Sequence, residues 1–488
     1  RITNKIYEPI LFNMKKDKLI NCIMLAVLVL VSYQTLAEVR LPSVFSSNMV
    51  LQQNKEVAIW GWASPGEQIK ITGSWNNKTV DVKTNSGAKW MTLLQTPIAG
   101  GPYVVTIEGE NTIILENVLI GEVWVCSGQS NMESSATHSY SFNNAKEEIS
   151  NANYPKIRLF QVEKATSDTK QEDLTGTWTL CSPETMKGFS GTAYFFAREL
   201  QNKLDIPIGL IHSSWGGTAA EVWMDKVVID ADPAFLENSS KLHVTDWWPT
   251  EAGSAFNAMI APIIPYGIAG TIWYQGESNT VAPLNYSRLF PALIKDWRNK
   301  WGHEFPFYYV QIAPFKYDKP DIGVLLRESQ LKAMSVSNTG MVVISDIGDI
   351  ANIHPTNKQD VGYRLAQWAL AKTYGKTDIS FSGPVYKEMK TESKKIKLFF
   401  DYAQKGLVAK GGDLTHFEIA GADKQFVPAK AKIIGNSIEV SSKKVKEPKA
   451  VRFAWDNIAE PNLFNSQGLP ASAFRTDDWE IVIQKKNE

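Results

Sequence analysis

Four short segments hold the residues whose types and spacing could do chemistry. They are Gly128-Gln129-Ser130-Asn131, Trp215-Gly216-Gly217-Thr218, Gln275-Gly276-Glu277-Ser278-Asn279 and Asn352-Ile353-His354-Pro355. A serine hydroxyl becomes a nucleophile when a histidine within hydrogen-bond reach takes its proton, and the oxyanion that then develops needs N–H donors. A serine, a histidine, glycine amides and an asparagine carboxamide supply these groups, so the four segments predict acyl transfer.

Each group has a predicted role in that reaction. Ser130 is the predicted nucleophile and His354 the predicted general base. The predicted oxyanion donors are the backbone N–H groups of Ser130 and of Gly216 or Gly217, together with the Asn279 carboxamide. The alternative for Ser130 is a turn serine that satisfies nearby backbone groups. Ser127 is the nearest rival serine, and we expect it to pack at the end of its strand.

The segments follow apolar runs that alternate with helical patterns. The runs at residues 123–127, 207–214, 267–275, 305–314 and 340–348 precede the helix-like stretches 191–204, 254–264, 285–301, 324–335 and 357–375, respectively. Strands that each lead into a helix predict an α/β fold whose five-stranded parallel sheet is doubly wound. In such a sheet the site lies at the carboxyl ends of the strands, where four of the five runs end in the polar segments or in Asp346–Asp349.

Patterns on either side of this region predict further domains. Residues 38–117 show short alternating strands between turn clusters, which is typical of a small β-sandwich. Residues 118–375 are then the catalytic domain. Residues 376–488 return to β patterning and form a second β module, or one that completes the first.

The first residues indicate export. Residues 14–37 combine three lysines, an apolar run and the small residues Thr35 and Ala37, a pattern typical of a signal peptide. The alternative is an uncleaved N-terminal anchor. Residues 1–13 resemble an upstream translation artefact. We therefore expect a periplasmic or secreted protein with no membrane span after cleavage.

The motifs GQSNM, WGGT, YQGESN and the IHP segment resemble the sialate O-acetylesterase-like branch of the SGNH hydrolases. The similarity begins at LPSVFSSNMVLQQ and covers nearly the whole chain after residue 37. It implies a flavodoxin-like SGNH domain flanked by β-sandwich-like modules. It also implies a serine esterase without metal or cofactor that removes acetyl groups from carbohydrates, typically from sialic acids. The superfamily's functional residues fall on Ser130, Gly216 or Gly217, Asn279 and His354.

One position departs from that superfamily. The triad aspartate usually lies three residues before the histidine, where this chain has Ala351. Asp349, five residues before His354, is the favoured substitute. The alternatives are Asp346 and a Ser–His dyad whose histidine is held by a backbone carbonyl.

Further residues at the strand ends are candidates for the substrate pocket, with a structural role as the alternative for each. They are Gln129, Trp215, Gln275, Glu277 and Arg327. A glycosidase needs two facing carboxylates, and nothing in the sequence pairs Glu277 with Glu221.

The composition limits the classes of molecule that the protein is expected to bind. The chain has 51 basic and 51 acidic residues, so its charge gives no reason to expect nucleic acid. No histidine pair has the spacing of metal ligands. After signal cleavage Cys126 and Cys181 remain, as a pair or as free thiols. The expected partner is an O-acetylated carbohydrate; acetylated xylan or pectin is the alternative substrate, and a noncatalytic carbohydrate-binding protein is the alternative of another class. The sequence makes no prediction of oligomeric state.

Overall fold

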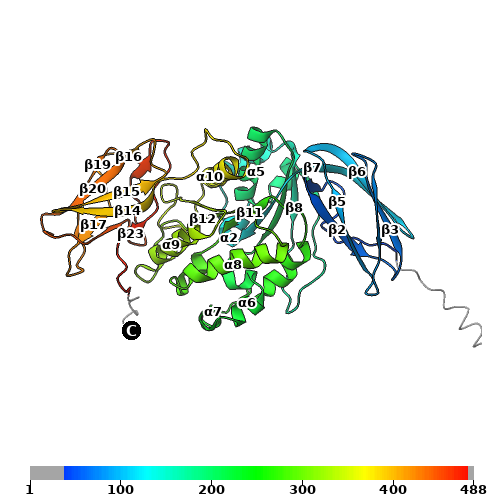
Figure 1. Ribbon diagram of the computed structural model, residues 1–488, viewed down its shortest axis with the longest axis horizontal. Coiled ribbons are helices and arrows are strands. Elements are labelled where there is room, and N and C mark those ends of the chain that lie inside the picture. The colour runs from blue at the N-terminus through cyan, green and yellow to red at the C-terminus, as the bar shows by residue number, and fades with distance from the viewer. Residues whose placement is uncertain (1–37, 482–488) are drawn as a thin grey trace, which may run out of the picture.

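The computed structural model describes residues 38–481 and arranges them as three parts in a row. Figure 1 shows an N-terminal β module at one end, a central α/β part, and a C-terminal β module at the other end. No helix within the described residues is long and apolar enough to cross a membrane. The predicted signal peptide lies outside the described residues.

Alternating strands build the N-terminal module. They are β1 (Val50–Gln52), β2 (Glu56–Trp62), β3 (Gln68–Gly73), β4 (Thr79–Lys83), β5 (Lys89–Gln95) and β6 (Gly100–Glu108). β2 and β5 form an antiparallel ribbon, while β3 pairs with β4 and β6. Buried and exposed residues alternate along β3, so one of its faces packs into the core.

A single long strand, β7 (Thr112–Gly128), joins this module to the central part. Its first half pairs antiparallel with β6, and its second half pairs parallel with β10 and β11. The predicted boundary between residues 117 and 118 falls inside this strand. The domain boundaries stay predictions.

The central sheet has the strand order β13-β12-β11-β7-β10-β8-β9. The five predicted strands occur as β7, β10 (Ile208–Ser214), β11 (Gly270–Tyr274), β12 (Phe307–Val310) and β13 (Thr339–Val342), all parallel.

The sheet is larger than the predicted five strands and it is mixed. β8 (Tyr154–Gln161) adds a parallel strand beside β10, and β9 (Trp178–Cys181) pairs antiparallel with β8. β8 was not among the five predicted strands, and Pro155, Lys156 and Arg158 interrupt its apolar pattern. Arg158 is nevertheless buried, since its guanidinium donates to the backbone carbonyls of Asn48 and Asn117.

Helices cover both faces of this sheet. α5 (Gly191–Leu204) and α10 (Lys358–Trp368) pack with Trp124 on one face, whereas α8 (Tyr286–Trp301) packs with Trp273 on the other. α9 (Ile322–Lys332) lies against α8. The shorter helices are α2 (Ser130–Glu133), α3 (Ala145–Asn151), α4 (Pro183–Met186), α6 (Lys226–Asp230), α7 (Pro233–Ser239), η1 (Ala220–Trp223), η4 (Glu277–Val281), η5 (Ala333–Ser335) and η6 (Ala369–Thr373).

The helix predicted at residues 254–264 is irregular. It consists of a π-helical turn, η2 (Phe256–Ile260), followed by a 3-10 turn, η3 (Ala261–Ile263). Pro262 and Pro265 lack the N–H groups that a longer α-helix would need there.

The C-terminal module contains two four-stranded sheets, β14-β15-β20-β19 and β18-β17-β21-β23, and the pair β16-β22. Its strands are β14 (Val385–Glu392), β15 (Lys395–Asp401), β16 (Leu407–Ala409), β17 (Phe417–Ala420), β18 (Val427–Pro428), β19 (Lys430–Ile434), β20 (Ser437–Ser441), β21 (Ala450–Phe453), β22 (Leu463–Asn465) and β23 (Phe474–Arg475). These strands bury a core of their own around Phe453 and Phe474.

Candidate active site

Three neighbouring strands end side by side at the edge of the sheet where the site is predicted. Gly128 at the end of β7 is in register with Ser214 of β10 and with Tyr274 of β11. The chain therefore leaves the sheet at adjacent points before Ser130, Gly216 and Glu277.

A sharp turn after β7 presents Ser130. Gly128 has a φ of +139°, and a Cβ added there would lie 2.2 Å from the Tyr274 carbonyl oxygen, so only glycine fits. Gln129 is extended and donates its N–H to the same carbonyl at 3.0 Å. Ser130 then begins α2 and remains 9% exposed.

His354 lies within hydrogen-bond distance of Ser130. The distance between His354 Nε2 and Ser130 Oγ is 3.0 Å. Burial, followed by the charges of Lys358 and His138, lowers the pKa of His354 to about 4. The imidazole is therefore neutral near pH 7 and can accept the serine proton.

Aromatic stacking and a backbone contact hold the His354 ring and its loop. The Tyr140 ring stacks on His354 with centroids 4.3 Å apart and an interplanar angle of 21°. The His354 N–H donates to Asn352 Oδ1 at 2.9 Å. Tyr140 was not a predicted site residue, because a tyrosine in a loop far from His354 in sequence carries no local signal for this contact.

The structure does not bring either candidate aspartate to His354. The exposed Asp349 carboxylate accepts the Ala351 N–H at 2.8 Å. Asp346 forms a two-bond ion pair with Arg364, with both distances at 2.7 Å. Within residues 38–481, His354 has no hydrogen bond to a carboxylate. The geometry is that of a Ser–His dyad, and the role of Asp349 stays a prediction.

The predicted oxyanion donors differ in their availability. The Ser130 N–H lies in the first turn of α2 and has no acceptor among the described residues. Gly216 lies close to the nucleophile, since a Cβ added to it would be 3.3 Å from Ser130 Cβ. Its N–H, however, already donates to the Glu133 carboxylate. Gly217, at φ +82°, has no acceptor for its N–H within the described part of the chain.

Asn279 is tightly held. Its Nδ2 donates to Glu221 Oε2 at 2.8 Å, while its Oδ1 accepts from the Ala220 N–H at 2.9 Å and from Gln275 Nε2 at 2.7 Å. This leaves the second Nδ2 hydrogen as the one that could reach an oxyanion. Glu221 therefore fixes an amide and faces Asn279 rather than Glu277.

Four of the five predicted pocket residues separate into three groups, and Glu277 is described after them. Gln129 and Gln275 are buried and hold the turn after β11, through Gln129 Oε1 to the Gly276 N–H and through Gln275 to Asn279. Trp215 is partly exposed and donates to the Trp247 carbonyl. The buried Arg327 donates to backbone carbonyls of the C-terminal module, at Asp456 and Asn457, so its placement gives no support to a substrate role.

Glu277 belongs to a buried polar cluster with Asn131 and Lys358. Asn131 Nδ2 donates to Glu277 Oε1 at 2.7 Å and to the Ile353 carbonyl at 3.0 Å, and Asn131 Oδ1 accepts from Lys358 Nζ at 2.6 Å. Lys358 is fully buried, and this burial lowers its pKa to about 7. Asn131, the residue after the serine, is thus hydrogen-bonded to Ile353, the residue before the histidine.

A second charged group lies beside Ser130. The Glu133 carboxylate is 2.6 Å from Lys164 Nζ and 3.7 Å from His138 Nε2. Lys164 also lies over the Trp215 ring, 5.5 Å from its centroid. Neither Glu133 nor Lys164 was predicted, because both lie outside the motif segments or at their margin.

Next to these groups is a small cavity of about 190 Å³, lined by Gly217, Leu242, Trp248, Glu277, Ser278 and others. Trp247, 80% exposed, belongs to the same 242–250 segment. Within the described residues no group of three or more histidine, cysteine, aspartate or glutamate side chains could hold a metal. Cys126 and Cys181 are both free and buried.

Comparisons with known proteins agree with this chemistry. Residues 120–371 match the family described as carbohydrate esterase, sialic acid-specific acetylesterase. The chain is 33% identical to the human sialate O-acetylesterase over 421 residues, which are 78% of this chain and 80% of that protein. It is 30% identical to the rat sialate O-acetylesterase over 490 residues, 85% of this chain and 89% of that one.

A solved structure is similar over nearly the same extent. The crystal structure of a carbohydrate acetylesterase from Xanthomonas citri superposes with a TM-score of 0.82 and 36% identity, covering 91% of this chain and 100% of that one.

Proposed function

Because the chain belongs to the carbohydrate esterase family of sialic acid-specific acetylesterases, and is therefore an O-acetyl ester hydrolase, we propose that it removes O-acetyl groups from sialic acids through Ser130. The observation that carries the mechanism is the 3.0 Å distance between Ser130 Oγ and His354 Nε2. The central α/β part is then an SGNH-type hydrolase domain. A purely noncatalytic carbohydrate-binding protein is excluded by the esterase family.

The reaction follows from the positions of these groups. Ser130 Oγ attacks the acetyl carbonyl while His354 Nε2 takes its proton. The Ser130 N–H and the remaining Asn279 Nδ2 hydrogen stabilise the oxyanion, with Gly217 as the donor from the glycine pair because the Gly216 N–H is bound to Glu133. The tetrahedral intermediate then collapses, the sugar oxygen leaves with the proton from His354, and an acetyl-enzyme remains.

Water completes the cycle. His354 takes a proton from a water molecule, which attacks the acetyl-enzyme carbonyl, and the proton then returns to Ser130 as acetate departs. The low pKa of His354, about 4, keeps the base neutral between the two half-reactions.

Electrostatics favour a second candidate substrate class, the acetyl esters of neutral plant glycans such as xylan. A sialic acid carries a carboxylate, and the Glu133 carboxylate lies against Gly216 beside the nucleophile. Lys164 would have to offset both charges, although it is already paired with Glu133. A neutral sugar meets no such repulsion.

Acetate release from 9-O-acetyl sialic acid and from acetylated xylo-oligosaccharides separates the two substrates. Faster turnover of the sialic acid ester supports the proposal, and faster turnover of the xylan ester replaces it with the second candidate. Ser130→Ala should lower the rate on either substrate by about 10⁴-fold or more.

Ser127→Ala is the matched control for the nucleophile. Ser127 is buried at the end of the same strand, and its hydroxyl has no hydrogen-bond partner among the described residues. Its removal should leave the rate within a few-fold of wild type. If Ser127→Ala abolishes activity while Ser130→Ala retains it, the nucleophile is misassigned.

Export is a further part of the proposal. Its support is the basic, apolar and small-residue pattern of residues 14–37. N-terminal sequencing of the protein recovered outside the cytoplasm should begin at Glu38. Recovery of the uncleaved chain in the membrane fraction would indicate an anchor instead.

A further inference from the structure

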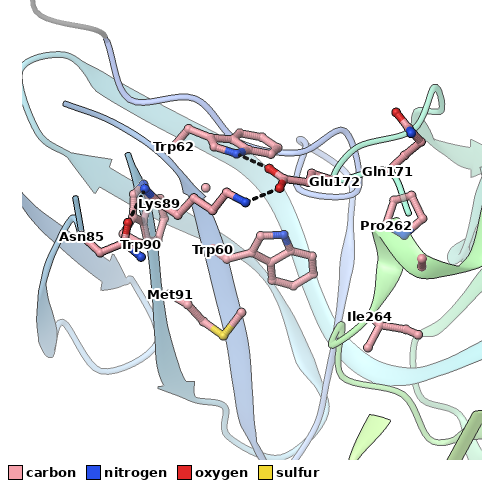
Figure 2. Close-up of a pocket in the computed structure, with 12 residues that line it drawn as sticks. Trp60, Trp62, Asn85, Lys89, Trp90, Met91, Gln171, Glu172, Pro262 and Ile264 are labelled. Atoms are coloured by element: carbon pink, nitrogen blue, oxygen red, sulfur yellow. Dashed lines mark hydrogen bonds and ion pairs between the residues drawn. The ribbon is translucent and has the colours of Figure 1, made fainter. Parts of the chain in front are cut away.

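The N-terminal module contributes an aromatic cavity that takes no part in the chemistry described above. It has a volume of about 380 Å³ and lies between the β2–β5 ribbon and two segments of the central part, a loop at Gln171 and Glu172 and the 3-10 turn η3 with Ile264 (Figure 2). This volume falls within the range of small-molecule sites, about 300–1,000 Å³. It is twice the volume of the cavity beside Gly217, and none of its lining residues belongs to the candidate active site. We call it the Trp60 pocket.

One face of the β2–β5 ribbon forms the floor of the Trp60 pocket. Trp60 and Trp62 are two residues apart on β2, so their indoles project to the same side of the ribbon. Across the ribbon, Trp60 pairs with Met91 and Trp62 with Lys89. Met91 is 53% exposed and adds apolar surface to this face of the ribbon.

The opposite wall comes from the central part of the molecule. Figure 2 shows Pro262 and Ile264 facing Trp60 across the cavity, with Gln171 and Glu172 at its edge. Glu172 accepts a hydrogen bond from Trp62 Nε1 at 3.1 Å and forms an ion pair with Lys89. These two contacts hold the Glu172 carboxylate at the edge of the pocket, above the indoles of Trp60 and Trp62.

This combination suits a sugar ring. A pyranose has apolar C–H faces, which an indole can cover, and a rim of hydroxyl groups that both donate and accept hydrogen bonds. At the rim of the pocket, Asn85 Nδ2 and Gln171 Oε1 have no hydrogen-bond partner within the described residues, whereas Glu172 is already bonded to Trp62 and Lys89. Lys89, the one cation among the lining residues, is already paired with Glu172, and Arg40 lies over the Trp62 ring, 5.6 Å from its centroid, so neither stands free at the rim for a sugar carboxylate.

We propose that the Trp60 pocket is a noncatalytic binding site for a neutral pyranose unit of a glycan. It is separate from the proposed esterase site and does not depend on which acetyl ester that site hydrolyses. Its place at the junction of two parts lets it hold a glycan while the central part acts on an ester.

Binding to the full-length Ser130→Ala protein tests this proposal without turnover. The probes are lactose, xylotetraose and mannotetraose as neutral sugars, and N-acetylneuraminic acid as the anionic one, each titrated by calorimetry and by saturation-transfer NMR. We expect at least one neutral probe to bind with a Kd below about 10 mM. Trp62→Ala should weaken that binding by about tenfold or more, and the milder Trp62→Phe by a smaller factor.

Trp75→Phe is the matched control, because Trp75 is a partly exposed tryptophan of the same module outside the pocket. The Trp75→Phe variant should bind the neutral probe with the same affinity as the Ser130→Ala protein. All three tryptophan variants, in a Ser130-containing background, should hydrolyse p-nitrophenyl acetate at the wild-type rate. This result would show that they fold and would separate this test from that of the esterase site.

Three results would overturn the proposal. They are the absence of binding by all three neutral probes, equal affinity of Trp62→Ala and Trp75→Phe, and binding of N-acetylneuraminic acid that depends on Trp62.

Discussion

The pH dependence of the esterase should report the unusual environment of His354. The structure lowers the pKa of this residue to about 4, first through burial and then through the charges of Lys358 and His138. At pH 5 an imidazole with a pKa of 4 is about 90% neutral, whereas one at the ordinary 6.5 is only about 3% neutral. kcat/KM at pH 5 should therefore be about 30-fold higher than an unperturbed histidine would allow.

Lys358→Gln isolates one of these causes. Glutamine keeps a donor for Asn131 Oδ1 but removes the charge, which is present throughout the relevant range because the pKa of Lys358 is about 7. Burial is the larger cause, so Lys358 accounts for at most half of the lowering from 6.5 to about 4. The acid limb should therefore move upward, but by no more than about one pH unit.

The assay is acetate release from p-nitrophenyl acetate, followed by proton NMR between pH 3.5 and 8. Lys372→Gln, at an exposed lysine, is the control and should leave the profile unchanged. A wild-type acid limb near pH 6.5 would refute the lowered pKa of His354. An unchanged limb in a folded Lys358→Gln variant would refute the part assigned to the Lys358 charge.

Three further outcomes follow from other contacts. The buried His212 has its pKa lowered to about 3 by burial, so this group binds more protons in the unfolded than in the folded state below pH 6.5. His212 should therefore contribute about 2 kcal/mol to the fall in the free energy of unfolding between pH 7 and pH 5, and denaturant titrations of His212→Gln should show a fall smaller than that of wild type by about this amount. Gly128→Ala should lower the melting temperature strongly and abolish activity, because its Cβ would lie 2.2 Å from the Tyr274 carbonyl oxygen, whereas Gly188→Ala, with open space around it, should do neither. Asp349→Asn should lower kcat/KM by less than about tenfold, because within residues 38–481 its carboxylate accepts a hydrogen bond only from the Ala351 N–H; a loss near 10⁴-fold would restore Asp349 as the triad acid.

The strand-end rule explains why much of the site could be predicted from the sequence. Parallel strands place their carboxyl ends at one edge, so Ser130 and Gly216 had to lie close together once the strands before them were recognised. Glycines after the strands, such as Gly128, also indicate these turns in the sequence, and in the structure Gly128 has a positive φ.

Residues that act through tertiary contacts could not be predicted in the same way. Lys358 is a lysine in the first turn of a helix, which is usually solvated, and only the fold shows that it is buried beside Asn131. Tyr140 reaches His354 from a segment more than 200 residues away. Arg327 looked suited to a pocket, but α9 directs it toward the C-terminal module.

The length of β7 has a consequence for how this molecule can be divided. The same strand pairs with the N-terminal module at Thr112 and ends at Gly128, two residues before the serine. A cut near residue 118 would leave the α/β part without the start of the strand that supports its nucleophile. The N-terminal β module can therefore be neither deleted nor replaced by another domain at that position. A shortened enzyme would have to keep the whole of β7.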